Sequence, residues 1–382
     1  DVLGSRGLGD VYKRQVADKH KSEVKKILDE AGVGYVKIGV PTEERHILVT
    51  KHDATYQFGI DYLRDVWYST SYLLDRKQSM NGCAKKRFEN YKQQPLEVVF
   101  DKSFTGKLSQ FGLNPDRRTP SGIKAAIIRE KGTNGEREMA YMLYLAGFDV
   151  KDVTMTDLVS GRETLEDINM VVYCGGFSNS DVLGSAKGWA GSFLFNPKAK
   201  AALDNFYARE DTLSLGVCNG CQLMMELGLI TPEDKKKGKM LHNDSHKFES
   251  AFLGVTVPMN RSVMFGSLSG SKLGIWVAHG EGKFSLPYPE DHYNVVLKYS
   301  YDEYPGNPNG SDYSVAGIAS QDGRHLAMMP HLERACFPWE NAYYPLDRKD
   351  NDQITPWMEA FVNARKWVEA VSYTHLRAHE TL

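Results

Sequence analysis

The sequence predicts an α/β protein in which a parallel β-sheet with helices on both faces is continued by an antiparallel extension. Three mainly apolar runs, 123–128, 170–174 and 213–217, alternate with segments of helical periodicity, and the run 170–174 is continuous. Apolar runs of this kind are typical of strands that are buried on both faces of a parallel sheet. From residue 251 to 329 the pattern changes to shorter alternating segments with turn signals, which favours antiparallel strands.

The elements before residue 93 are predicted from hydrophobic spacing. Apolar residues indicate a helix over 24–31, short strands over 35–40 and 46–50, and a helix over 58–74. The next segment, 93–121, contains Pro95, Pro115 and Pro120 together with glycines. It is therefore predicted to be a linker, with a domain boundary near residue 122.

The elements after this boundary follow in a βα order. A core strand over 123–128 precedes a helix over 134–146 that Gly147 closes, and strands and helices alternate as far as Leu229. A last helix is predicted over 357–368, after Pro356. Because ligands bind at the carboxyl ends of the strands in such sheets, we expect a site beyond residues 174 and 217.

Cys218 stands at one of these strand ends, in Gly216-Val217-Cys218-Asn219-Gly220. The segment predicts a strand, a sharp turn and a helix, and flanking glycines leave room for both the turn and a substrate. A thiol is a nucleophile only as a thiolate, which the start of a helix favours but a base must complete. Cys218 is thus the candidate nucleophile.

The best candidate base is His331, which follows the strand-like run 325–329. Glu333 lies two residues later and on the same side of an extended backbone, so it can orient the imidazole. Cys218, His331 and Glu333 are the predicted catalytic triad.

The Gly175-Gly176 pair ends the apolar run 170–174 and precedes Phe177. Glycines allow backbone N–H groups to approach a ligand closely. The N–H groups of Gly176, Phe177 and Asn219 are the predicted oxyanion hole.

The composition excludes several classes of protein. The chain is 41% hydrophobic and 25% charged with a net charge of −2, so no electrostatic bias toward nucleic acid or a membrane exists. It contains no run of 18 apolar residues, and its five cysteines favour a reducing compartment such as the cytoplasm. No cluster with metal-ligand spacing is found.

The motif Gly-x-Cys-x-Gly-x-Gln, the Gly-Gly turn and the late His-x-Glu resemble the class I glutamine amidotransferases. More narrowly, the chain resembles the glutaminase domain and the end of the synthetase domain of large, single-chain phosphoribosylformylglycinamidine synthases. Motifs that carry this narrower resemblance are Gly175–Ser178, Asp181–Gly184, Gly188–Ala190, Asn260–Ser262, Ala278–Gly282, Trp67–Gln78 and Lys86–Tyr91.

The resemblance implies a flavodoxin-like sheet over 122–369, a linker over 93–121, and a truncated α+β remnant of the synthetase over 16–92. It implies L-glutamine as the substrate, a γ-glutamyl thioester on Cys218, and contacts from Gly175 and Gln222 to glutamine. Further residues that it suggests for the site or for an ammonia passage are Asn260, Arg261, His279 and Glu281.

The family's synthetase domains would be the partners that receive ammonia. The resemblance implies that ATP, Mg²⁺ and formylglycinamide ribonucleotide bind in that absent amino-terminal part, and that this part of the chain needs no cofactor. Leu332 stands where many relatives have proline, and Asn179-Ser180 where many have Tyr-Gly.

Both ends of the chain look foreign to this family. Residues 5–15 match one translation of a common sequencing transposon adapter, and residues 371–381 match a translation of its reverse complement. We therefore expect residues 1–15 and 370–382 to be adapter-derived tails. A basic targeting or nucleic-acid-binding tail is the alternative.

Three other functions remain open from the sequence. The first is a γ-glutamyl hydrolase or cysteine peptidase on the same scaffold. The second is a redox or metal protein that uses Cys218 and Cys221 as a Cys-x-x-Cys pair. The third is a non-catalytic partner domain.

Overall fold

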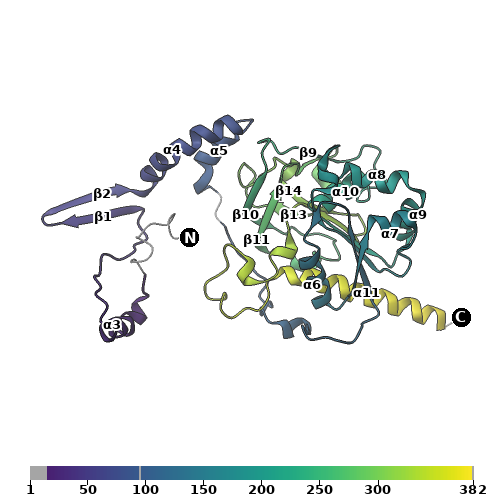
Figure 1. Cartoon of the computed structure of the whole chain (residues 1–382), viewed down its shortest axis with the longest axis horizontal. Coiled ribbons are helices and arrows are strands. Elements are labelled where there is room, and N and C mark those ends of the chain that lie inside the picture. The colour runs from purple at the N-terminus through teal and green to yellow at the C-terminus, as the bar shows by residue number, and fades with distance from the viewer. Residues whose placement is uncertain (1–14, 94–95, 381–382) are drawn as a thin grey trace. The chain divides into compact units, whose positions relative to one another are not determined.

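A computed structural model describes residues 15–93 and 96–380 of the chain, with side chains up to residue 371 (Figure 1). Most of the tail expected over 1–15 therefore lies outside the described residues. The chain divides into two compact units, one up to Trp67 and one from Tyr68 onward. The boundaries expected at residues 16, 93, 122 and 370 remain predictions.

The first unit contains helix α3 (Lys21–Glu30) and an antiparallel hairpin of β1 (His46–Lys51) and β2 (Ala54–Gly59). The expected strand over 35–40 is wrong, because these residues are irregular and Val36 and Ile38 are largely exposed. Alternating apolar residues form a strand only where a partner ladder is present. Strand β2 was missed because its last residues were included in the helix predicted from residue 58. The helix, α4 (Ile60–Gln78), begins only after β2 ends.

The second unit is built on a nine-stranded sheet. Five parallel strands lie in the order β5-β3-β6-β8-β15. They span Asp149–Thr154, Lys124–Arg129, Met170–Tyr173, Leu213–Val217 and His325–Met328, respectively. Counted along the chain this is the order 2-1-3-4-5, which is the flavodoxin-like arrangement that we expected.

Helices cover both faces of these parallel strands. The connection through α6 (Glu136–Ala146) leads from β3 to β5, at one edge of the sheet. The later connections lead in the opposite direction along the strand order, from β5 to β6, β8 and β15. Since parallel crossovers are right-handed, this reversal puts α6 on the face opposite to the later helices. The later helices are α7 (Met155–Ser160), α8 (Lys187–Phe195), α9 (Pro197–Ala208) and α10 (Asn219–Glu226).

The antiparallel extension continues the same sheet. Strand β15 pairs with β14 (Val315–Ala319), and β13 (Asn294–Tyr299), β10 (Glu249–Thr256) and β11 (Lys272–His279) follow in that order. Two small ladders stand apart from it, β4 (Thr133–Asn134) with β7 (Gly175–Gly176), and β9 (Lys239–Leu241) with β12 (Lys283–Ser285).

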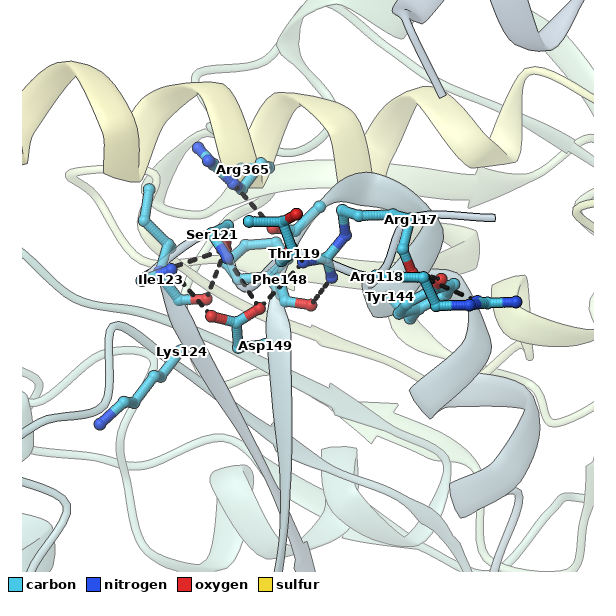
Figure 2. A network of polar contacts seen from close by, with 12 residues as sticks. Arg117, Arg118, Thr119, Ser121, Ile123, Lys124, Tyr144, Phe148, Asp149 and Arg365 are labelled. Atoms are coloured by element: carbon cyan, nitrogen blue, oxygen red, sulfur yellow. Dashed lines mark hydrogen bonds and ion pairs between the residues drawn. The ribbon is translucent and has the colours of Figure 1, made fainter. Parts of the chain in front are cut away.

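The segment from Tyr68 to residue 121 carries the end of α4, helix α5 (Cys83–Glu89) and short 3₁₀ turns. Val99 forms a bridge with Lys272 at the edge strand β11. Figure 2 shows how the segment ends: Arg117 donates to Phe148 O at 2.7 Å and to Asp149 at 3.0 Å, and the N–H groups of Ser121 and Gly122 also donate to Asp149. This clamp fixes the start of β3 beside the start of β5.

The carboxyl-terminal helix α11 (Trp357–Glu380) is longer than the sequence predicts. Its residues Trp357, Met358, Phe361, Val362 and Val368 are buried, and it packs beside α6 (Figure 1). Among the described helices, none combines the length and the apolarity that crossing a membrane requires.

Candidate active site

Cys218 lies between the end of β8 and the start of α10, with φ 51° and ψ −106°. Positive φ is strained for a residue other than glycine, and such strain is stored at functional turns. The flanking glycines are required by close packing, since a Cβ on Gly220 would lie 2.0 Å from Tyr173 O and one on Gly216 would lie 2.5 Å from Gly220 O. The local sequence therefore builds a nucleophile elbow at the carboxyl edge of the sheet.

His331 and Glu333 follow β15, the strand next to β8. The His331 N–H donates to Trp276 O at 2.9 Å, and its Nδ1 lies 2.7 Å from Glu333 Oε1. Both side chains are buried, at 3% and 1% exposure. The carboxylate thus fixes the orientation of the ring and leaves Nε2 as the nitrogen available for other contacts.

The charge state of His331 depends on its neighbours. Burial of the ring lowers its pKa, but the Glu333 carboxylate and a hydrogen bond with Cys218 outweigh burial and raise the pKa from 6.5 to about 10. A base of this strength can take the thiol proton and hold a thiolate beside an imidazolium.

Gly175 lies against both groups. A Cβ at this position would be 2.8 Å from His331 Cε1 and 3.3 Å from Cys218 Cβ, so only glycine leaves the pair undisturbed. The next residue, Gly176, has φ 121° and faces Thr133 in the ladder between β4 and β7. The Phe177 N–H donates to Gly132 O at 2.8 Å. Because hydrogen-bonded and non-bonded pairs alternate in an antiparallel ladder, the Gly176 N–H points away from β4.

Asn219 and Gln222 form a buried chain of amides on the first turn of α10. Asn219 Oδ1 accepts from the Ser178 N–H at 3.0 Å, and its Nδ2 donates to Gln222 Oε1 at 2.9 Å. Gln222 Nε2 in turn donates to Glu281 O at 2.7 Å. These hydrogen bonds connect the turn at Cys218 to the segment 278–282. In this segment, Ala278 O also accepts a weak hydrogen bond from Cys218 Sγ at 3.6 Å.

His279 is the second buried histidine of this region. Only 2% of it is exposed, and neither ring nitrogen has a hydrogen-bond partner among the described residues. Burial, followed by the charge of His331, lowers its pKa from 6.5 to about 3. His279 is therefore neutral and has unused hydrogen-bonding capacity.

Cys218 lines a cavity with a volume of about 230 Å³, whereas Gly175, Asn219, His331 and Glu333 do not line it. Of the site residues expected from the sequence, Gly176, Phe177, Cys218, Gln222, His279 and Glu281 line it. Asp181 also lines the cavity, and burial followed by repulsion from Glu281 raises its pKa. Its Oδ1 is buried and has no partner within the described part of the chain.

Asn260 and Arg261 do not lie at this cavity. They follow the eight-residue strand β10, which runs away from the cavity. This strand begins at Glu249, which pairs with His279, and ends at Thr256, which pairs with Lys272. Asn260 donates to Pro258 O at 2.9 Å, and Arg261 contacts Gln321. The motif forms a turn at the far end of the hairpin, and a role in an ammonia passage stays a prediction.

Sequence reasoning missed one wall of the cavity. This wall is the segment 242–248, which contributes His242, His246, Lys247 and Phe248. The segment has no periodicity and no recognised motif. The only signal in the sequence is the i, i+4 pair of histidines, which is too common to indicate a site.

Residues 122–368 match the family profile of the CobB/CobQ-like glutamine amidotransferase domain. The chain is 40% identical over 333 residues to the probable phosphoribosylformylglycinamidine synthase of Arabidopsis thaliana, which is described as chloroplastic/mitochondrial. It is also 40% identical over 336 residues to the phosphoribosylformylglycinamidine synthase of Homo sapiens. These alignments cover 81% and 80% of the chain but only 23% and 24% of the relatives, so the chain spans about a quarter of their length.

Among solved structures, a chain of PurLQS from Thermotoga maritima aligns with a TM-score of 0.49 and 25% identity. The alignment covers 65% of this chain and 98% of that one.

Proposed function

Because the chain belongs to the CobB/CobQ-like glutamine amidotransferase family, we propose that it hydrolyses L-glutamine through a thioester on Cys218. The observation that carries this proposal is that the strained Cys218, which lines a small cavity, lies beside the buried His331–Glu333 pair. A Cys–His–carboxylate set at a strand end is the arrangement that acyl transfer to sulfur requires.

In the proposed reaction, His331 takes the Cys218 proton and the thiolate attacks the side-chain amide carbon of glutamine. The C–N bond breaks as the imidazolium gives its proton to the departing ammonia, which leaves a γ-glutamyl thioester. His331 then takes a proton from water, and the hydroxide attacks the thioester to release glutamate and restore the thiol. Glu333 stabilises the imidazolium in both halves of the reaction.

The negative oxygen formed in each half needs fixed donors. We assign this role to the N–H groups of Gly176 and Asn219. The first points away from the β4 ladder, and the second lies in the first turn of α10, where N–H groups lack helical partners. The Phe177 N–H, also expected in this role, is engaged with Gly132 O.

Glutamine would be held by Gly175, Gln222, His279 and Glu281. Support comes from the unpartnered ring nitrogens of His279 and from the position of Gln222 and Glu281 on the cavity wall. The acidic groups Asp181 and Glu281 suit the α-ammonium group of the substrate.

The larger proposal is that this glutaminase supplies ammonia to a phosphoribosylformylglycinamidine synthase. The two relatives above carry that name, and residues upstream of the family match align with them as well. ATP, Mg²⁺ and formylglycinamide ribonucleotide would bind in the part of such a protein that this chain lacks. We assign the protein to the cytoplasm as part of the same proposal.

Without that part we expect slow glutamine hydrolysis that no nucleotide controls. Efficient, ligand-independent turnover by the 382-residue chain would contradict the coupling that this larger proposal assumes.

The experiment that tests the glutaminase proposal measures glutamate release and labelling by a glutamine-directed chloroketone. The wild-type chain should do both, and Cys218→Ala should do neither. Cys221→Ala is the matched control, because this thiol is fully buried in α10 and should be dispensable. Loss of activity in Cys221→Ala as well as in Cys218→Ala would instead support a Cys-x-x-Cys protein, which needs both thiols.

A further inference from the structure

A cluster of two buried carboxylates and two partly exposed cations joins the segment upstream of the family match to the wall of the cavity. Asp75, on α4, accepts from Arg87 of α5 at 2.7 Å and from Lys247 at 2.8 Å. Arg87 also donates to Glu249 at 3.0 Å. Asp75 and Glu249 are 6% and 7% exposed, so each carboxylate depends on these partners.

Two further hydrogen bonds connect the turn between α4 and α5 to the backbone of the segment 242–248. The Met80 N–H donates to Ser245 O at 3.0 Å, and Asn81 Nδ2 donates to Asp244 O at 2.8 Å. The segment 242–248 is therefore held from the α4–α5 side at three points, Asp244, Ser245 and Lys247.

The other side of this segment is attached to the catalytic region. Asn243 is fully buried: its Nδ2 donates to His279 O at 2.7 Å, its N–H donates to Gly280 O at 2.9 Å, and its Oδ1 accepts from the Gly282 N–H at 3.0 Å. Glu281, within the same stretch, accepts from Gln222. An uninterrupted set of contacts thus runs from Asp75 to the first turn of α10.

We propose that Asp75 and Asn81 are positioning residues for the glutamine pocket, because they fix the segment 242–248 that forms one of its walls. The inference rests on the proposed glutaminase function. It assigns a task at the active site to residues that precede the family match at 122. Neither residue touches the reacting atoms, so their loss should weaken the binding of glutamine while leaving the triad intact.

The test compares Asp75→Asn with wild type in the 382-residue chain. Loss of the carboxylate charge removes the partner of Lys247, and KM for glutamine should rise about tenfold, which corresponds to one charged hydrogen bond, while kcat changes less than about twofold. Iodoacetamide, which needs no glutamine pocket, should alkylate Cys218 at the wild-type rate. The matched control is Asp204→Asn, which removes an exposed pair with Lys200 on α9 and should change nothing.

A second readout does not depend on activity. Amide hydrogen exchange over 242–248 should accelerate in Asp75→Asn and in the milder Asn81→Ala, and should be unchanged in Asp204→Asn. Unchanged KM and unchanged exchange in a folded variant would overturn the inference, as would equal losses of kcat and of alkylation. If Asp75→Asn does not fold, Asn81→Ala decides by the same criteria. A wild-type chain that neither releases glutamate nor labels would overturn the proposed function instead, and hydrogen exchange would still decide the positioning claim.

Discussion

At the scale of single residues, the site depends on close contacts that leave no spare volume. Because Gly175 has no side chain, the Cys218 and His331 side chains pack directly against the backbone of β7, and the hydrogen bond from His331 to Glu333 fixes the orientation of the ring. These residues are far apart in the sequence, but each lies at the end of a parallel strand. The proximity of Cys218, His331 and Glu333 could therefore be predicted from motif and strand position together, and their catalytic roles stay a proposal.

Glu333→Gln should slow glutamine hydrolysis by about 10²- to 10⁴-fold, because the imidazolium loses its carboxylate. The pKa of His331 falls in this variant, so less thiolate forms at neutral pH. The measurement is the pH dependence of Cys218 alkylation, which should shift to more alkaline pH. Glu138→Gln, which removes a nearby exposed carboxylate, is the control; the same pH profile in wild type and Glu333→Gln would refute this role.

Gly175→Ala should lower kcat about 100-fold, since the added methyl group displaces His331 by part of an ångström. Gly191→Ala on α8 is a matched control, as its Cβ would meet Phe195 only at an ordinary 3.7 Å. Full activity of a folded Gly175→Ala would mean that the two side chains do not act as a pair.

At the scale of elements, the apolar runs predicted the parallel strands β3, β6, β8 and β15, and the exposed strand β1 was also predicted, whereas β2 was missed and a strand over 35–40 was wrong. The run 170–174 is buried on both faces and is unmistakable, whereas 35–40 has similar residues but forms no strand. The segment 242–248 could not be predicted as a pocket wall, because the contact from Lys247 to Asp75 spans 172 residues and leaves no local pattern. Contacts of this range are fixed by the tertiary fold and not by spacing in the chain.

The clamp around Asp149 should contribute measurably to the stability of the second unit. Asp149→Ala leaves Arg117 and two backbone N–H groups without their acceptor, so the melting temperature should fall by roughly 2–8 °C. Asp152→Ala, which removes an exposed pair with Arg129, should shift it by less than about 2 °C. Calorimetry measures both melting temperatures. Equal shifts in the two variants would show that the clamp contributes no more stability than an exposed ion pair.

At the scale of the whole molecule, the buried histidines give opposite pH dependences, because burial lowers the pKa of His279 and of His325, the latter to about 4, whereas the pKa of His331 is raised. His279 has a folded pKa of about 3, so between pH 6.5 and 3 the unfolded chain binds a proton that the folded chain excludes, and stability falls as the pH falls. His331 has a raised pKa, so its contribution to the stability of the folded state is fully present below pH 6.5 and is lost as the pH rises toward 10.

His279→Gln should therefore reduce the stability lost between pH 6.5 and pH 5 by about 1–2 kcal/mol. Urea unfolding at the two pH values, followed by tryptophan fluorescence, measures this difference. An identical loss in wild type and variant would mean that His279 is not held neutral in the folded state.

The proposed mechanism requires a covalent intermediate on Cys218. The most direct measurement is acid quenching of the chain during incubation with labelled glutamine, followed by mass spectrometry of its peptides. We expect a γ-glutamyl group on the peptide that contains Cys218, present in Cys221→Ala and absent in Cys218→Ala. Ammonia release without such an adduct, or an adduct that persists in Cys218→Ala, would contradict the proposed mechanism.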